Sequence, residues 1–240
     1  MSKRRAFTLI ELLVVIAIFA ILAALATSAI TGTLAKGRET KCASNLRQIG
    51  AGLILFAADH DGDLPETTHS NGAQFRRAWI FTLKPYLADC DEVRISPADP
   101  LGAQRLAENG TSYVLNSWVF VPQYGPFGEV EARFDNLRRL PLPTHTMLAF
   151  NVSDQQPASV LNDHTHCDLW PGNWSRVCAE IQPDRHRTGA SGKGHLNGAS
   201  NILYADGHVA AMEASDLHKL VMSQVPVGKP PMETEDILQP

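Results

Sequence analysis

The feature that most constrains this chain is an apolar run of 19 uncharged residues, 12–30, close to the N-terminus. A helix needs about 20 predominantly apolar residues to cross the hydrocarbon core of a bilayer. Lys3, Arg4 and Arg5 precede the run with no acid among them, which favours a cytoplasmic N-terminus. The sequence therefore predicts a single-pass protein of the cytoplasmic (inner) membrane, in contact with its lipid, with most of the chain on the periplasmic or extracellular side.

One carboxylate, Glu11, stands at the start of the apolar run. A charge at mid-bilayer costs roughly 2.5–3.5 kcal/mol on insertion scales and less near the interface, so Glu11 requires a partner. Cleavage between Ala6 and Phe7 would create an α-amino group four residues before Glu11. In a bundle of helices, the amine of one subunit could pair with Glu11 of its neighbour, and assembly would then neutralise both charges.

The segment FTLIELLVVIAIFAILAAL, residues 7–25, resembles the N-terminal segment of type IV pilins and of the pseudopilins of type II secretion. The resemblance implies that prepilin peptidase, a membrane aspartyl protease, removes residues 1–6 as a leader and N-methylates Phe7. It also implies that Phe7 and Glu11 direct assembly with other pilin or pseudopilin subunits into a homo- or hetero-filament, which could reach the cell surface. Ala6 departs from the family, which usually has Gly before the cleavage site.

An apolar N-terminal run is also compatible with a secretory signal peptide or a plain membrane anchor. A signal peptide has an apolar region of about 7–15 residues and a cleavage site of small residues. The sequence ATSA at residues 26–29 could supply such a site. However, the run is longer than a signal peptide needs and carries Glu11 at its edge, so pilin-type processing is favoured.

Beyond the predicted transmembrane helix, residues 7–30, the chain has room for one globular head. Leu46, Ile49, Leu53 and Phe56 recur at helical spacing, which predicts that the helix continues over residues 31–58. Gly32 and Gly37 each weaken a helix by about 1 kcal/mol relative to Ala, so two separate helices are the alternative.

The head is predicted to span residues 59–225. Residues 112–115, 118–121 and 146–152 are rich in β-branched and aromatic side chains, as strands are. The fold class is therefore α+β: a long N-terminal transmembrane helix, a pilin-like spine, packed on an antiparallel β-sheet head. The Pro-rich, acidic end, 226–240, is predicted to be disordered, and the polar insertion 153–194 to be displayed outward.

The C-terminal segment GHLNGASNILYADGHVAAM, residues 194–212, contains a motif with His195, Asn201, Asp206, Gly207 and His208. Its residues predict strands at 201–205 and 208–212, joined by a two-residue type I′ turn. Together with residues 42–65, the segment resembles a subfamily of pilin-like proteins, found mainly in planctomycetes, that carries a His, nine residues and Asp-Gly (an H-x9-DG domain). Here ten residues separate His195 from Asp206. We favour a structural role for the motif over catalysis.

Two segments could hold a metal ion. Residues 59–63 have the acid spacing of a calcium loop but lack the Glu that closes an EF-hand, so a solvated turn is favoured. His164 and His166 lie in HTHCD, which resembles part of the His-x-His-x-Asp-His run of metallo-β-lactamase-type hydrolases and could bind zinc. The alternative function is therefore a membrane-tethered, metal-dependent hydrolase or ligand-binding protein that uses the His-rich region 164–208.

Four cysteines in an exported domain suggest disulfides. Cys167 with Cys178 is the most local pair and leaves Cys42 with Cys90, although spacing alone does not fix the pairing.

The net charge of −4 provides no basic field for nucleic acid. The predicted function is a non-catalytic subunit of a type IV pilus-like or pseudopilus-like filament, assembled through the N-terminal helix and without a cofactor.

Overall fold

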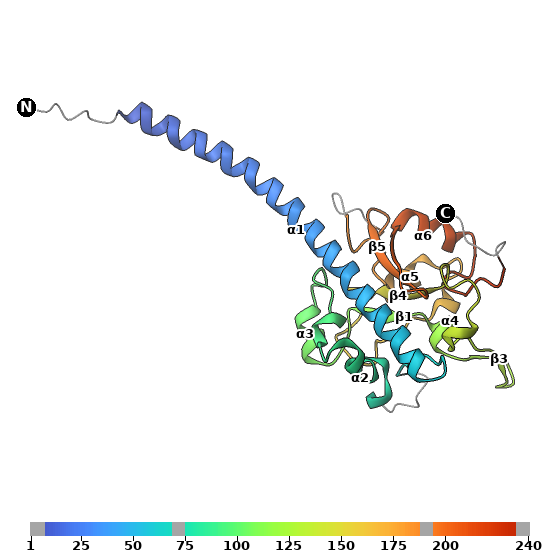
Figure 1. Cartoon of the computed structure of the whole chain (residues 1–240). Helices are drawn as coiled ribbons and strands as arrows, with labels where there is room; N and C mark the ends of the chain where they lie inside the picture. The colour runs from blue at the N-terminus through green and yellow to red at the C-terminus, as the bar shows by residue number, and fades with distance from the viewer. Residues whose placement is uncertain (1–7, 69–74, 188–193, 234–240) are drawn as a thin grey trace, which may run out of the picture. The chain divides into compact units, whose positions relative to one another are not determined.

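A computed structural model describes residues 8–68, 75–187 and 194–233. The chain forms two compact units, residues 1–37 and 38–240. The helix α1, Leu9–Asp59, is continuous through Gly32 and Gly37, and a Cβ at either glycine would meet no atom within 4 Å (Figure 1). The single long helix is therefore confirmed, and the alternative of two separate helices is wrong.

The second unit, which we call the head, adds short elements to the part of α1 that begins at Arg38. The α-helices are α2 (Trp79–Thr82), α3 (Gly102–Ala107), α4 (Ser117–Phe120), α5 (Trp174–Glu180) and α6 (Ala214–Met222). The 3-10 helices are η1 (Phe75–Arg77), η2 (Lys84–Leu87), η3 (Asp91–Arg94), η4 (Leu137–Arg139) and η5 (Cys167–Leu169). The strands are β1 (Tyr113–Leu115), β2 (Gln123–Tyr124), β3 (Val130–Ala132), β4 (Met147–Asn151), β5 (Ala199–Tyr204) and β6 (Val209–Glu213).

A four-stranded antiparallel sheet in the order β1-β4-β5-β6 forms the centre of the head. Its register places Val114 opposite Phe150 and Ile202 opposite Ala210. The strands β2 and β3 form a separate antiparallel pair. The structure thus confirms the predicted α+β class, a long helix packed on an antiparallel sheet.

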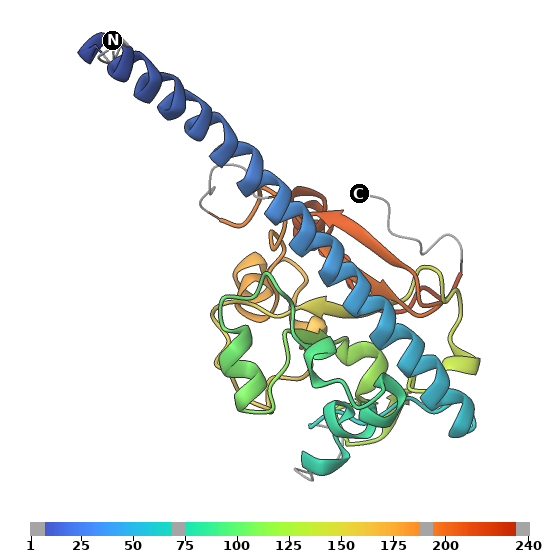
Figure 2. The same cartoon turned by 60° about the vertical axis from the view of Figure 1, so that its left-hand side comes forward.

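The part of α1 in the head covers one face of the sheet. Leu46, Ile49 and Leu53 are each 0 % exposed and share a core cluster with Leu115 and Leu203. Successive strand side chains point to opposite faces. Accordingly, neighbours of these strand residues form a second cluster with side chains of α5 and α6 on the other face. Figure 2 shows this part of α1, in light blue to cyan, lying over the sheet.

Of the predicted strands, 112–115 and 146–152 are found as β1 and β4, but 118–121 is not a strand. That segment forms the helix α4, because the side-chain oxygen of Asn116 accepts a hydrogen bond from the backbone N–H of Trp118 at 3.1 Å. An Asn at this position satisfies a free N–H of the first helical turn. The local cap therefore overrides the strand preference of the aromatic and β-branched residues.

The structure describes the chain up to residue 233, whereas the composition predicted disorder from residue 226. Val227 is 0 % exposed, and the carbonyl of Gly228 accepts a hydrogen bond from Nδ2 of Asn116 at 2.6 Å. The Nζ of Lys229 lies 5.6 Å from the centroid of the Trp118 ring. The prediction of disorder is therefore wrong for residues 226–233, while 234–240 lie outside the described residues.

The segment 153–187 is part of the core rather than an outward loop. Asp163, Thr165, Trp170 and Val177 are each 0 % exposed. The segment supplies η5 and α5, whose apolar side chains cover the second face of the sheet. The predicted outward display of this insertion is therefore wrong for these residues, and residues 188–193 lie outside the described part.

Candidate functional site

The helix α1 begins with a reciprocal pair of hydrogen bonds between Thr8 and Glu11. The backbone N–H and the hydroxyl of Thr8 donate to Oε2 of Glu11 at 2.9 Å and 2.8 Å, and the backbone N–H of Glu11 donates to Oγ1 of Thr8 at 3.3 Å. This arrangement is a capping box, and a carboxylate in the first turn also complements the helix dipole. Glu11 therefore has a structural role in the single chain. The Thr-x-x-Glu spacing is the sequence signal that could have predicted this role.

The apolar side chains after Glu11 are exposed in the single chain. Leu9, Phe19 and Leu25 are 78 %, 67 % and 64 % exposed. An 18-residue window of α1 has a mean hydropathy of 3.0 and none of it is buried. By length and composition this helix could cross a membrane, although a signal sequence would pass the same test.

Residues 1–27 match the family model described as the prokaryotic N-terminal methylation motif. The match includes Ala6, Phe7 and Glu11, and it distinguishes this segment from an ordinary signal sequence. It indicates a membrane-anchored protein with a type IV pilin- or pseudopilin-like N-terminus that is processed by prepilin peptidase. Comparisons with curated proteins and with solved structures found no match. Ala6 and Phe7 themselves lie outside the described residues.

The C-terminal motif connects the β5–β6 hairpin to α1. Asn201, which is 4 % exposed, donates from Nδ2 to the carbonyl of Glu39 on α1 at 3.1 Å. At the hairpin turn, a Cβ on Gly207 would lie 3.2 Å from Cδ1 of Ile54 on α1. These contacts give Asn201 and Gly207 a structural role at the junction of the hairpin with α1.

The turn itself differs from the predicted type I′ geometry. The N–H of Gly207 donates to the carbonyl of Tyr204 at 2.9 Å, and the N–H of Tyr204 donates to the carbonyl of His208 at 3.0 Å. Gly207 has a φ of 88°, whereas Asp206 does not adopt a positive φ. Its Oδ1 instead accepts the backbone N–H of His208 at 3.0 Å. The connection is therefore a three-residue loop that ends in a left-handed Gly.

The two histidines of the motif each contact a carboxylate. Nδ1 of His195 lies 3.0 Å from Oδ1 of Asp184. Nδ1 of His208 lies 2.6 Å from Oδ1 of Asp206, and its ring stacks on Tyr204 at a centroid distance of 4.4 Å. His195 and His208 therefore have different carboxylate partners.

We expect Gly50→Ala to destabilise the head because Gly50 is where the hairpin approaches α1. A Cβ on Gly50 would lie 2.7 Å from Cδ1 of Leu203 and 3.4 Å from Cα of Gly207. Overpacking of this kind lowers the free energy of unfolding by about 1–3 kcal/mol. The effect can be measured by urea unfolding of the full chain in detergent, followed by tryptophan fluorescence.

Gly37→Ala is the matched control, since it makes the same change in the same helix where no atom lies within 4 Å. It should cause no loss, because Ala favours a helix by up to about 1 kcal/mol over Gly. A loss for Gly37→Ala as large as that for Gly50→Ala would contradict the packing explanation.

His164 and His166 lie together, with ring centroids 5.1 Å apart. Nδ1 of His164 is 2.8 Å from Oδ1 of Asp163, and Nδ1 of His166 is 3.2 Å from Oε1 of Glu180. Within the described ranges, no group of three or more His, Cys, Asp or Glu side chains could hold a metal ion. Such a group is therefore absent among the described residues around His164 and His166, where zinc was the alternative, and around residues 59–63, where a solvated turn was favoured over calcium.

Glu180 is the centre of a buried polar network and is 6 % exposed. It accepts hydrogen bonds from the indole N–H of Trp170 at 2.8 Å and the backbone N–H of His166 at 2.8 Å, and it forms an ion pair with Arg176 at 2.7 Å. Burial disfavours its charge, but the bonds from His166 and Trp170 and the charge of Arg176 outweigh burial and lower its pKa. The network therefore holds η5 against α5.

The pair of His166 and Glu180 should make the stability of the head depend on pH. The hydrogen bond to Glu180 raises the pKa of His166, against burial and the charge of Arg176, which lower it. A histidine whose pKa is raised by folding stabilises the folded state at pH values below its pKa in the unfolded chain, about 6.5. This stabilisation is lost as the pH rises through the pKa in the folded state. We expect the free energy of unfolding to fall from about pH 6 to about pH 8.

His166→Gln should flatten this dependence in urea unfolding measured across the same pH window. The side chain of His166 is 43 % exposed, so screening by solvent keeps the effect small. Equal slopes for the two proteins would show that His166 does not gain a proton on folding.

All four cysteines are free thiols. Sγ of Cys167, which is 0 % exposed, lies 2.9 Å from Oγ1 of Thr165. Cys42 is also buried, Cys90 is exposed, and burial raises the pKa of Cys178 to about 11. The suggested disulfides of Cys167 with Cys178 and of Cys42 with Cys90 are not formed in this structure. Cys42 packs in the cluster beneath α1, and Cys167 packs in the cluster on the other face of the sheet.

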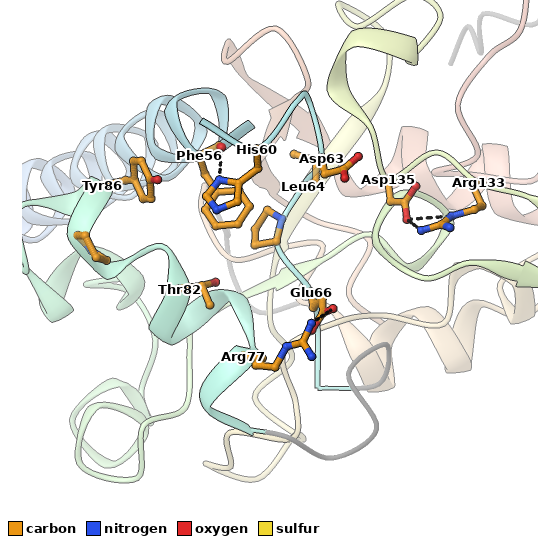
Figure 3. Close-up of a pocket in the computed structure, with 12 residues that line it drawn as sticks. Phe56, His60, Asp63, Leu64, Glu66, Arg77, Thr82, Tyr86, Arg133 and Asp135 are labelled. Atoms are coloured by element: carbon orange, nitrogen blue, oxygen red, sulfur yellow. Dashed lines mark hydrogen bonds and ion pairs between the residues drawn. The ribbon is translucent and has the colours of Figure 1, made fainter. Parts of the chain in front are cut away.

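An open cavity of about 700 Å³ borders the C-terminal end of α1 (Figure 3). Its volume lies within the range of about 300–1,000 Å³ that is usual for ligand pockets. The lining residues come from the end of α1 and from three later segments: Phe56, His60, Asp63, Leu64, Pro65, Glu66, Arg77, Thr82, Pro85, Tyr86, Arg133 and Asp135. Of this region, the sequence marked Phe56, as part of a helical face, and residues 59–63, as a turn.

Proposed function

We propose that this chain is a non-catalytic subunit of a type IV pilus-like or type II pseudopilus-like filament. The observation that carries the proposal is the methylation motif at residues 1–27, at the start of a helix whose apolar side chains are exposed. In the membrane these side chains contact lipid. In a filament they become buried against the helices of neighbouring subunits, where packing replaces lipid contact.

The proposed sequence of events begins when prepilin peptidase cuts between Ala6 and Phe7 and methylates the new amine. The helix then stays in the membrane until the subunit is assembled. During assembly, Glu11 of one subunit pairs with the amine of Phe7 of its neighbour. The capping box supports this role, because it fixes the carboxylate of Glu11 at the first turn of α1.

We also propose that the N-terminus is cytoplasmic and that the head lies on the opposite side of the membrane. Cations flank both ends of the apolar run, at residues 3–5 before it and at Lys36, Arg38 and Lys41 after it. The orientation therefore rests on pilin-type processing of the leader rather than on a count of charges. Protease added to spheroplasts is expected to digest the head, and full protection of the head would contradict this orientation.

The C-terminal motif supports assignment to the subfamily with the H-x9-DG-like motif. In this chain Asn201 and Gly207 join the β5–β6 hairpin to α1. The motif then serves to dock the sheet on the helical spine rather than to carry out a reaction.

The filament proposal can be tested by shearing cells that produce the chain at its native level. We expect the chain in the sheared filament fraction and its loss from that fraction when the prepilin peptidase is inactivated. A chain that stays in the membrane fraction in both strains would contradict the filament role.

A further inference from the structure

We propose that the cavity at the end of α1 binds a pyranose unit of a neutral saccharide. The cavity is formed by the head alone, so this inference does not depend on filament assembly. Two features of the lining indicate this ligand class: a wall of aromatic rings and two arginine–carboxylate pairs.

The aromatic wall consists of Phe56, His60 and Tyr86. The rings of Phe56 and His60 stack at a centroid distance of 3.9 Å and an interplanar angle of 7°, and Tyr86 meets Phe56 edge-on at 5.6 Å. Nδ1 of His60 lies 2.7 Å from the carbonyl of Phe56, which fixes the outer ring. Figure 3 shows these rings on one side of the cavity. A fixed, flat ring offers an apolar surface to the C–H face of a sugar ring.

The two arginine–carboxylate pairs supply the polar part of the lining. Arg77 lies 2.6 Å from Oε1 of Glu66, and Arg133 lies 2.6 Å from Oδ2 of Asp135. A paired guanidinium keeps further N–H donors, and a paired carboxylate keeps further acceptor positions. Each pair therefore presents donors and acceptors side by side, which is the pattern that neighbouring hydroxyl groups require.

The charges of the lining also favour a neutral ligand. Three carboxylates, including Asp63, face two guanidinium groups in the lining. The near balance gives no strong attraction to either sign of charge, because the arginines repel cations and the carboxylates repel anions. A neutral polyhydroxyl ring satisfies the donors, the acceptors and the aromatic wall together.

The test uses the full chain, purified in a detergent without a sugar headgroup, and titration calorimetry with defined tetrasaccharides. Chitotetraose and cellotetraose are the neutral probes and distinguish an N-acetylated amino sugar from a plain glucan. Tetragalacturonate and deacetylated chitosan tetramer are the anionic and cationic counterparts. We expect at least one neutral probe to bind with a Kd of about 1 mM or tighter. Both charged probes should bind about ten-fold more weakly.

Two variants test the assigned residues. Glu66→Gln removes the carboxylate and His60→Ala removes the outer ring, and each should weaken binding of the neutral probe by about ten-fold or more. Asp216→Asn is the matched control, because Asp216 forms an ion pair with Lys219 at 2.7 Å on α6 and does not line the cavity. It should bind as the parent chain does.

The proposal is overturned if no neutral probe binds in the millimolar range or if a charged probe binds more tightly. It is also overturned if Glu66→Gln and His60→Ala both bind as the parent chain does. Thermal unfolding of each variant establishes that the head is folded in the binding experiment.

Discussion

Replacing Glu11 by alanine is expected to reduce incorporation into filaments by about a hundred-fold or more, while the head remains folded. In the proposed filament, the replacement would leave the amine of a neighbouring Phe7 without its partner in a dry helical bundle. Breaking one side of a buried ion pair costs about 3–5 kcal/mol, and each 1.4 kcal/mol is about ten-fold in an equilibrium. The measurement is the amount of the variant in the sheared filament fraction relative to the membrane fraction.

Glu11→Gln separates the two roles of this side chain. Glutamine can form the capping-box bond with Thr8 that Glu11 forms at 2.9 Å, but it carries no charge. If the charge pair is required, both Glu11→Gln and Glu11→Ala fail to assemble. Normal assembly of Glu11→Gln together with failure of Glu11→Ala would show that helix capping, not charge pairing, is the function of Glu11.

The second large effect is expected at Arg105 in the core of the head. Its side chain and that of Asp99 are 0 % exposed, with Nε of Arg105 2.8 Å from Oδ2 of Asp99. The guanidinium also donates to three backbone carbonyls of the segment that follows β4, those of Ser153, Gln156 and Pro157, at 3.1, 2.9 and 3.0 Å. Arg105 therefore neutralises a buried carboxylate and anchors that segment to α3.

Arg105→Met should lower the free energy of unfolding by about 3–5 kcal/mol, because it leaves the buried carboxylate of Asp99 without a counter-charge. Domains are stable by only about 5–15 kcal/mol, so much of the stability would be lost. The measurement is urea unfolding of the full chain in detergent. Adding Asp99→Asn should recover part of the lost stability, because it removes the unpaired buried charge.

Arg138→Met provides the matched control for this experiment. Arg138 is 61 % exposed and lies 4.0 Å from Asp61. Surface changes of this kind usually alter stability by less than about 0.5 kcal/mol. A cost below about 1 kcal/mol for Arg105→Met would contradict the role assigned to the buried pair.

Local patterns explain which parts of the fold could be predicted from the sequence. The apolar spacing at Leu46, Ile49 and Leu53 predicted the helical face that packs on the sheet, and all three residues are 0 % exposed. The hairpin was also foreseen, but its loop length was not, because the side chain of Asp206 bonds to His208 instead of entering a type I′ turn. The helix α4 was not predicted, because its formation depends on a single capping residue, Asn116.

The rest of the head depends on contacts between residues far apart in the chain. Arg105 donates a hydrogen bond to the carbonyl of Pro157, which lies 52 positions later in the chain. No local sequence pattern predicts this contact. The lining of the cavity likewise combines His60 with Tyr86 and Arg133, which gather only after the chain has folded. By contrast, the N-terminal motif is a contiguous segment that the peptidase acts on, and could therefore be predicted directly.

The most direct test of the central claim is the N-terminal residue of the mature chain. The full chain is co-expressed with a prepilin peptidase, with an inactive peptidase as control, and the protein in the membrane fraction is analysed by mass spectrometry. The account predicts an N-methylated Phe7 with the active enzyme and an intact leader with the inactive one. An intact leader in both samples, or a mature chain that starts near Ala29 or Ile30, would contradict pilin-type processing.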